Sequence, residues 1–167
     1  MKIQTFLHKL NWRLILIHFI AAWFFMHFFQ TLAFLSDIEL VDMIRNRGES
    51  DFASTLEKNN VDPSRLFYLE VSMSLGKTLG LLVAFIISLT ICIKRKWFWV
   101  NSLIVFISAY TLSWFNLLGW AYLKNIFLSA GELFNNTTAE VLTNSLLLLT
   151  LGLLFFFLPS VNKFIAK

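Results

Sequence analysis

Charged side chains are scarce in this sequence of 167 residues. Asp, Glu, Lys and Arg make up 14% of it, whereas hydrophobic residues make up 57% and aromatic residues 17%. Soluble domains carry about 25% charged and about 45–50% apolar residues. A domain of this size still exposes much of its surface, so one small core cannot bury so many apolar side chains. The composition therefore excludes an ordinary soluble domain and indicates an integral membrane protein.

Cysteine pairs and metal-ligand clusters are also missing from the sequence. Cys92 is the single cysteine, which excludes an intramolecular disulfide. His18 and His27 are nine residues apart, so at about 100° per residue they face opposite sides of one helix. We therefore expect no metal centre and no cofactor. His27 and Gln30 share a face, and we expect them to form a hydrogen-bonding contact with a neighbouring helix.

Nucleotide-binding and nucleic-acid-binding motifs are absent as well. Gly76-Lys77-Thr78 looks like the end of a phosphate-binding loop, but such a loop needs a glycine where this sequence has Val71. The triplet also lies inside a long apolar stretch, where helical amides are already bonded along the helix axis. We therefore expect a membrane helix here, and nucleic acid is not an expected partner.

Long apolar runs are abundant. A helix of about 20 residues crosses about 30 Å of hydrocarbon, and four runs reach that length. They cover residues 14–35, 66–93, 97–123 and 141–158. The sequence predicts an all-α integral membrane protein, in which residues 1–167 form a single polytopic domain built as a four-transmembrane-helix bundle.

Residues that cap helices occur near the expected ends of these runs. Asp62 precedes Pro63, which predicts a helix N-terminus at this point. Ser36 with Glu39, and Thr137 with Glu140, have the spacing of capping boxes. Pro159 is expected to end the last span.

Positive charge predicts the orientation of the chain. Eight basic residues lie on one side of the predicted spans, and all ten acidic residues lie on the other side. Short loops rich in Lys and Arg stay in the cytoplasm. We therefore expect both termini to be cytoplasmic, in a bacterial cytoplasmic (inner) membrane. Residues 36–62 then form an extracytoplasmic loop that contains short amphipathic helices. The eight basic residues are Lys2, Lys9, Arg13, Lys94, Arg95, Lys96, Lys163 and Lys167.

A stripe of small residues runs along the second predicted span at four-residue intervals. Small side chains let another helix approach closely in lipid. The partner helix belongs either to this chain or to another subunit. The stripe consists of Ser72, Gly76, Gly80, Ala84 and Ser88.

Several polar residues near the outer boundary of the membrane are candidates for ligand binding. An ionisable group inside a membrane is a functional candidate, and Lys77 with Glu70 is the pair to consider. The alternative is that Lys77 extends its ammonium group to the headgroups without binding a ligand. The candidate residues are Glu70, Lys77, Ser74, Arg65, Tyr110, Trp114 and Asn116.

Three functions are compatible with these features. The first is a non-enzymatic membrane subunit or accessory protein that packs with another membrane protein, or with its own copies, through the stripe and the loop of residues 36–62. The second is binding or transport of a small molecule or lipid by Glu70 and Lys77. The third is a membrane-embedded enzyme acting on lipid or peptide, for which Ser74 and Lys77 are the available dyad. Because no paired catalytic set is present, we favour a non-enzymatic role.

Overall fold

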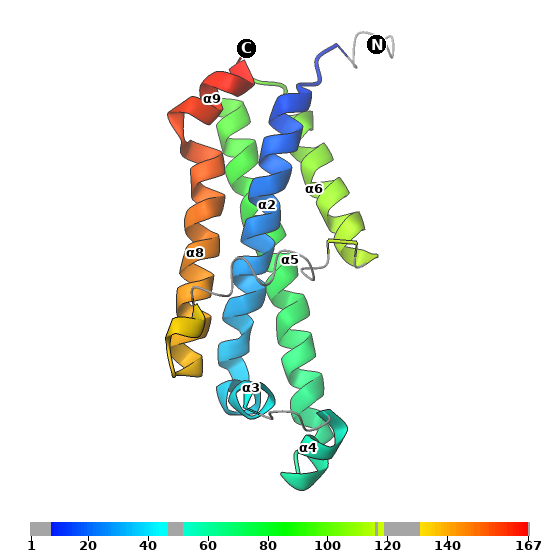
Figure 1. Cartoon of the computed structure of the whole chain (residues 1–167). Helices are drawn as coiled ribbons and strands as arrows, with labels where there is room; N and C mark the ends of the chain where they lie inside the picture. Colours follow the sequence, from blue (N-terminus) through cyan, green and yellow to red (C-terminus); the bar gives the residue numbers. More distant parts are fainter. Residues whose placement is uncertain (1–7, 47–51, 116, 119–130, 167) are drawn as a thin grey trace.

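All regular secondary structure in the described part of the chain is helical (Figure 1). The computed structural model describes residues 8–46, 52–115, 117–118 and 131–166. The helices are α2 (Trp12–Leu32), the 3-10 helix η1 (Ala33–Asp37), α3 (Ile38–Arg45), α4 (Phe52–Lys58), α5 (Pro63–Lys94), α6 (Val100–Trp114), the 3-10 helix η2 (Gly131–Leu133), α8 (Thr137–Phe157) and α9 (Pro159–Ala166).

Three of the described helices are long and apolar enough to cross a membrane, which indicates a membrane location. They are α2 with its continuation, α5 and α8. The short helices expected between residues 36 and 62 are present as α3 and α4. The structure therefore confirms an all-helical chain of membrane type.

The third predicted span, residues 97–123, is not one continuous helix. The helix α6 has 15 residues and ends at Trp114, so it is about 22 Å long. Phe115 N–H donates to the Thr111 carbonyl at 3.1 Å, and Leu117 N–H donates to the Leu112 carbonyl at 2.9 Å. Bonds of this kind satisfy the last carbonyls of a helix and close it. Residues 116 and 119–130 lie outside the described part of the chain.

The α-helical part of the first predicted span, residues 14–35, is also shorter than expected, since α2 ends at Leu32 and η1 follows.

The caps of two other helices lie one residue from their predicted positions. Asp37 rather than Ser36 caps α3, and Asn136 rather than Thr137 caps α8. Thr137 instead donates its hydroxyl proton to Asp42. A one-residue error is expected where two residues able to cap a helix are adjacent.

The predicted start of α5 is confirmed. The Asp62 carboxylate accepts a hydrogen bond from Ser64 N–H at 2.9 Å, and Pro63 is the first helical residue. That bond lowers the pKa of Asp62 below its ordinary value. The charged form of the cap therefore stabilises the helix at neutral pH, and its contribution is lost as the pH falls through the lowered pKa.

The central helix of the bundle is α2, which contacts α5, α6 and α8 (Figure 1). Its buried side chains include small residues such as Ala21 and Ala22 beside large ones such as Phe25 and Met26. Small residues allow the neighbouring helices to come close, and the aromatic rings fill the space between them. On α8, Phe156 joins the same apolar core.

The small-residue stripe of α5 packs on α2. A Cβ atom added to Gly76 would lie 2.6 Å from the Phe29 carbonyl oxygen, and one added to Gly80 would lie 2.7 Å from Met26 Cα. The next stripe residues, Ala84 and Ser88, are fully buried. The glycines of the stripe therefore pack against another helix of this chain, which is one of the two alternatives that the sequence left open.

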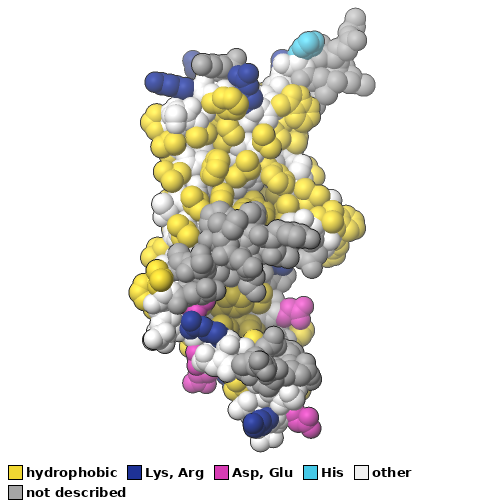
Figure 2. All heavy atoms as spheres, in the orientation of Figure 1, with side chains coloured by type: hydrophobic (Ala, Val, Ile, Leu, Met, Phe, Trp, Pro, Cys, Tyr) yellow, Lys and Arg dark blue, Asp and Glu magenta, His cyan; other side chains and the backbone are white. Residues whose placement is uncertain are grey.

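Acidic side chains gather at one end of the helices: among the described residues, Figure 2 shows Lys and Arg without Asp or Glu at its upper end, and Lys and Arg together with Asp and Glu at its lower end. At one end Asn11 donates its side-chain amide to the Ile165 carbonyl at 2.9 Å, and Asn101 accepts from Asn11 N–H at 3.1 Å. At the other end Arg45 forms an ion pair with Glu140 at 2.7 Å. The start of α2 therefore lies beside the end of α9, and α3 lies beside the start of α8.

Candidate functional site

The polar residues of α5 and α6 meet where α6 ends. Lys77 precedes Lys94 by seventeen residues, so the two lie about 26 Å apart along α5. Since α6 is only 15 residues long, its last turn reaches the level of Lys77 and extends no further. The outer part of α5 therefore continues past the end of its neighbour.

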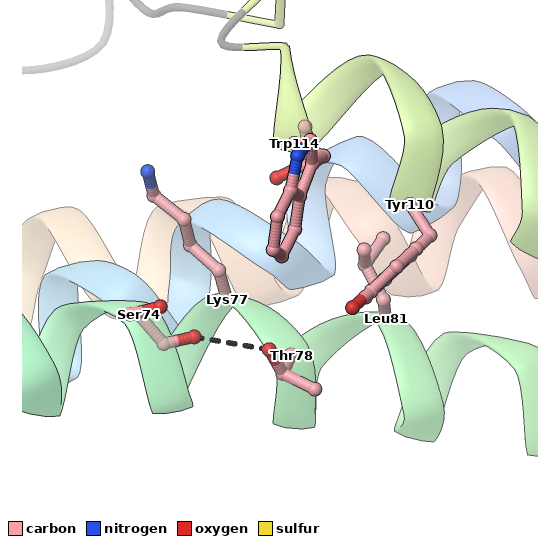
Figure 3. Close-up of a pocket in the computed structure, with 7 residues that line it drawn as sticks. Ser74, Lys77, Thr78, Leu81, Tyr110 and Trp114 are labelled. Carbon is pink, nitrogen blue, oxygen red and sulfur yellow. Dashed lines mark hydrogen bonds between the residues drawn. The ribbon is translucent and has the colours of Figure 1, made fainter.

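A cavity of about 280 Å³ lies between the two helices at this level. Polar side chains make up most of its lining, and Figure 3 shows Tyr110 and Trp114 extending from α6 toward α5. We call this cavity the α5–α6 recess. Its lining residues are Ser74, Lys77, Thr78, Leu81, Tyr110, Ser113 and Trp114.

Hydrogen-bond donors are in excess in the α5–α6 recess. Thr78 donates its hydroxyl proton to the Ser74 carbonyl at 3.1 Å, so its proton is already used. Within the described residues, the Lys77 ammonium and the Tyr110 hydroxyl have no protein acceptor. Among the described residues, the lining contains one cation and no carboxylate, which gives this part of the recess a net positive charge.

Four of the seven ligand-binding candidates line this recess, namely Ser74, Lys77, Tyr110 and Trp114. Two others, Glu70 and Arg65, are not among the lining residues, and Glu70 is exposed. Asn116 lies outside the described residues. Thr78 and Ser113 were not predicted as site residues, although Thr78 is one residue from Lys77 and Ser113 is three residues from Tyr110.

Arg65 binds an acidic partner outside the recess. Its guanidinium donates to both carboxylate oxygens of Asp37, from Nε at 2.8 Å and from Nη2 at 2.5 Å. A second carboxylate, that of Glu39, lies 3.6 Å from Nη2. This bidentate arrangement joins η1 to the start of α5. Arg65 therefore holds the outer segment in position and is not available to a ligand in the recess.

A second polar cluster is fully buried between α2, α5 and α6, and the sequence did not predict it. His18 Nδ1 lies 2.7 Å from Ser88 Oγ, which donates to Ser102 Oγ at 2.8 Å. Ser102 in turn donates to Cys92 Sγ at 3.2 Å. With the Ser88 hydroxyl donating to Ser102, the Ser88 oxygen accepts a hydrogen bond from His18 in the tautomer that carries its proton on Nδ1. The four side chains form a hydrogen-bonded chain that joins three helices.

His27 makes hydrogen bonds both within α2 and outside it. Its Nδ1 lies 3.1 Å from Gln30 Oε1 on the same helix, and its ring packs edge-on against Trp23 at 4.6 Å. The imidazole also hydrogen-bonds to the backbone of Leu118, beyond the end of α6. The expected contact with a neighbouring segment is therefore made through Leu118, whereas the bond to Gln30 stays within one helix. Within the described residues, no three His, Cys, Asp or Glu side chains gather where they could hold a metal ion.

The Ser74–Lys77 dyad considered for catalysis lines the recess, but no hydrogen bond joins Ser74 Oγ to Lys77 Nζ. A nucleophilic serine needs a base within hydrogen-bonding reach and a group that stabilises the oxyanion. Neither requirement is met by the contacts around Ser74.

Comparison of the chain with protein-family models, with curated proteins and with solved structures finds no match. The arguments about function therefore start from the geometry of the recess and of the bundle.

Proposed function

We propose that this chain is a non-enzymatic membrane protein that crosses the bilayer four times and binds an anionic ligand in the α5–α6 recess. The ligand is a small molecule or a lipid. The single observation behind the binding proposal is that Lys77 and its neighbouring donors find no acceptor and no carboxylate among the described residues that line the cavity.

The connections between the helices support four crossings. Lys9 lies 5.9 Å from the ring centroid of Phe98, which precedes α6, so the α5–α6 turn is at the same end as the start of α2. Arg45 contacts Glu140 at the opposite end, where α8 begins. The chain between α6 and α8 must therefore travel from one end of the bundle to the other, even though α6 alone is too short to do so.

Charge supports an orientation with both termini in the cytoplasm. Lys9, Arg13 and Lys163 lie at one end of the bundle. The segments that flank the predicted spans at that end contain no Asp or Glu. Arg13 is held there over the Phe164 ring at 5.0 Å. Lys and Arg close to span ends are retained on the cytoplasmic side.

The recess supports anion binding for a physical reason. Donors that face hydrocarbon without an acceptor cost free energy, so Lys77 and Tyr110 need water or a ligand as an acceptor. One cation among hydroxyl groups favours a ligand with negative charge and several acceptor atoms. An extended Lys77 that only reaches for the headgroups would not require the hydroxyls of α6 at the same place.

An accessory role through the stripe is not carried further, because the stripe contacts α2. Two carboxylates of the segment between α2 and α5 also find partners within the chain, Asp37 in an ion pair with Arg65 and Asp42 in a hydrogen bond from Thr137. The recess is therefore the better basis for a function.

Photo-crosslinking tests the binding proposal. We would introduce p-benzoylphenylalanine in place of Trp114, which is 76% exposed at the edge of the recess. A matched control carries it in place of Leu146, which is 60% exposed on α8. We expect a ligand adduct at position 114 in native membranes that disappears with Lys77→Met and returns with Lys77→Arg. Adducts of equal yield at both positions, insensitive to Lys77, would rule the proposal out.

A further inference from the structure

We infer that the ligand of the α5–α6 recess is the phosphate group of an anionic phospholipid from the outer leaflet, which enters sideways between α5 and α6. This inference rests on the proposed function and adds the class of ligand and its route. It combines the charge of the recess, its size, and the apolar surface beside it.

The first step is the chemistry of the lining. Lys77 offers an ammonium group, and Ser74, Tyr110 and Ser113 offer hydroxyls. A lysine ammonium binds phosphate as a compact point charge. Hydroxyl groups donate hydrogen bonds to the phosphate oxygens that the ammonium does not contact. No carboxylate in the lining competes for Lys77 or repels the phosphate. In Figure 3 the ammonium points away from the α5 ribbon, on the side where Trp114 stands.

The second step is size. Sites for complete small-molecule ligands enclose about 300–1,000 Å³. The recess encloses about 280 Å³, which accommodates a headgroup but leaves no room for acyl chains. The chains of a bound amphiphile must therefore lie outside the cavity, against the surface of the protein.

The third step is the surface beside the recess. Leu75 and Leu82 lie three and four residues from Thr78, so they neighbour it on the surface of α5, and they are 60% and 41% exposed. On α6, Trp114 is 76% exposed. These side chains present apolar surface to acyl chains. A free phosphate would contact the same donors but would gain nothing from this surface. The lipid therefore fits both the lining and its surroundings.

The fourth step is depth. With Lys94 at the cytoplasmic boundary, Lys77 lies about 26 Å away in a hydrocarbon layer about 30 Å thick. A lysine side chain at that depth reaches the level of the outer phosphates. The phosphate of an outer-leaflet lipid needs little displacement to meet it.

Lipid retention provides the test. The full chain is reconstituted in vesicles of phosphatidylcholine with a minority of phosphatidylglycerol, extracted in mild detergent and weighed by native mass spectrometry. We expect phosphatidylglycerol to be retained in preference to phosphatidylcholine. Lys77→Met should lower that retention about fivefold, the effect of one lysine on binding to an anionic headgroup. Tyr110→Phe should lower it about threefold, the effect of one hydrogen bond.

Two matched variants separate a specific site from general electrostatics. Lys77→Arg keeps the charge and should retain phosphatidylglycerol. Lys163→Met removes one positive charge from the exposed surface at the opposite end, and should retain it too. Equal losses for Lys163→Met and Lys77→Met, or equal retention of both lipids by the unchanged chain, would overturn the inference.

A soluble competitor separates the lipid from a free anion. Inorganic phosphate and glycerol 3-phosphate carry the same acceptor oxygens without acyl chains. If either displaces phosphatidylglycerol, the recess binds a free anion and the lipid assignment is wrong. An adduct at position 114 that depends on Lys77, together with no preference for phosphatidylglycerol, would leave the proposed function standing and remove this inference alone.

Discussion

Gly80 limits how closely the helices α5 and α2 approach each other. Its hypothetical Cβ would lie 2.7 Å from Met26 Cα and 2.8 Å from the Phe25 carbonyl carbon, which are backbone atoms. Gly152 on α8 offers a comparison, since a Cβ there would meet the Phe25 ring at 2.7 Å. A ring can rotate or shift slightly, whereas the backbone of a helix cannot do so without moving the helix.

We therefore expect Gly80→Ala to destabilise the bundle by about 2 kcal/mol, within the range of overpacked cores. Gly152→Ala should cost less, because the Phe25 side chain can adjust and alanine has the higher helix propensity. The measurement is thermal unfolding of both variants in the same detergent. Equal melting temperatures for Gly80→Ala and the unchanged chain would show that α2 and α5 are not in contact at Gly80.

At the scale of single residues, the sequence predicted the lining of the α5–α6 recess better than the buried hydrogen-bonded cluster around His18. Lys77, Ser74, Tyr110 and Trp114 were predicted together because their depth in the membrane follows from counting along two antiparallel helices. The link between His18 and Ser102 depends on how α2 and α6 are rotated, which residue counting does not provide. Arg65 was assigned to the ligand because the path of η1, which brings Asp37 to it, is not visible in the sequence.

At the scale of helices, ion pairs join the ends of the helices that lie away from the two termini, between elements that are not consecutive in the chain. Arg65 at the start of α5 binds Asp37 of η1 through two guanidinium nitrogens, and the Asp37 side chain is 19% exposed. Glu39 also lies near Arg65, at 3.6 Å, but its side chain is 86% exposed. A bidentate and partly buried pair contributes more than an exposed pair held by a single contact.

Asp37→Asn should lower the free energy of unfolding by about 1 kcal/mol, the upper end for a pair near the surface. Asparagine still accepts the bond from Leu40 N–H that caps α3, so the variant loses charge and keeps the cap. Glu39→Gln is the matched control and should change stability by less than about 0.5 kcal/mol. Denaturant unfolding at low and high salt measures both. A loss for Asp37→Asn that does not shrink at high salt would contradict an ionic origin.

The boundaries of the helices were predicted well where a cap and a change of composition coincide. Asp62-Pro63 gave the start of α5 to the residue, and Pro159 follows the end of α8 at Phe157 by two residues. The end of α6 at Trp114 was missed, because apolar residues continue beyond it and no proline or glycine marks the stop. Closure by the Leu117 to Leu112 bond leaves no trace in composition.

At the scale of the whole molecule, the four-crossing arrangement requires that α4 and α9 lie on opposite sides of the membrane. Glu57 is exposed on α4, beyond the outer end of the bundle, and Lys163 is exposed on α9 beside the start of α2. The native thiol of Cys92 is fully buried between the helices. A chain with Cys92→Ala therefore offers a background in which single introduced thiols report the side on which they lie.

In intact cells we expect a membrane-impermeant maleimide to label Glu57→Cys and to spare Lys163→Cys until the membrane is permeabilised. The physical reason is that segments rich in Lys and Arg, such as the one that contains α9, are retained in the cytoplasm. The segment between α2 and α5, which contains α4, is transferred across the membrane. Both positions are exposed, so a difference in labelling reports the side and not burial. Labelling of Lys163→Cys alone would invert the orientation and move the recess to the inner leaflet. Labelling of both in intact cells would mean that the number of crossings between α4 and α9 is even rather than odd.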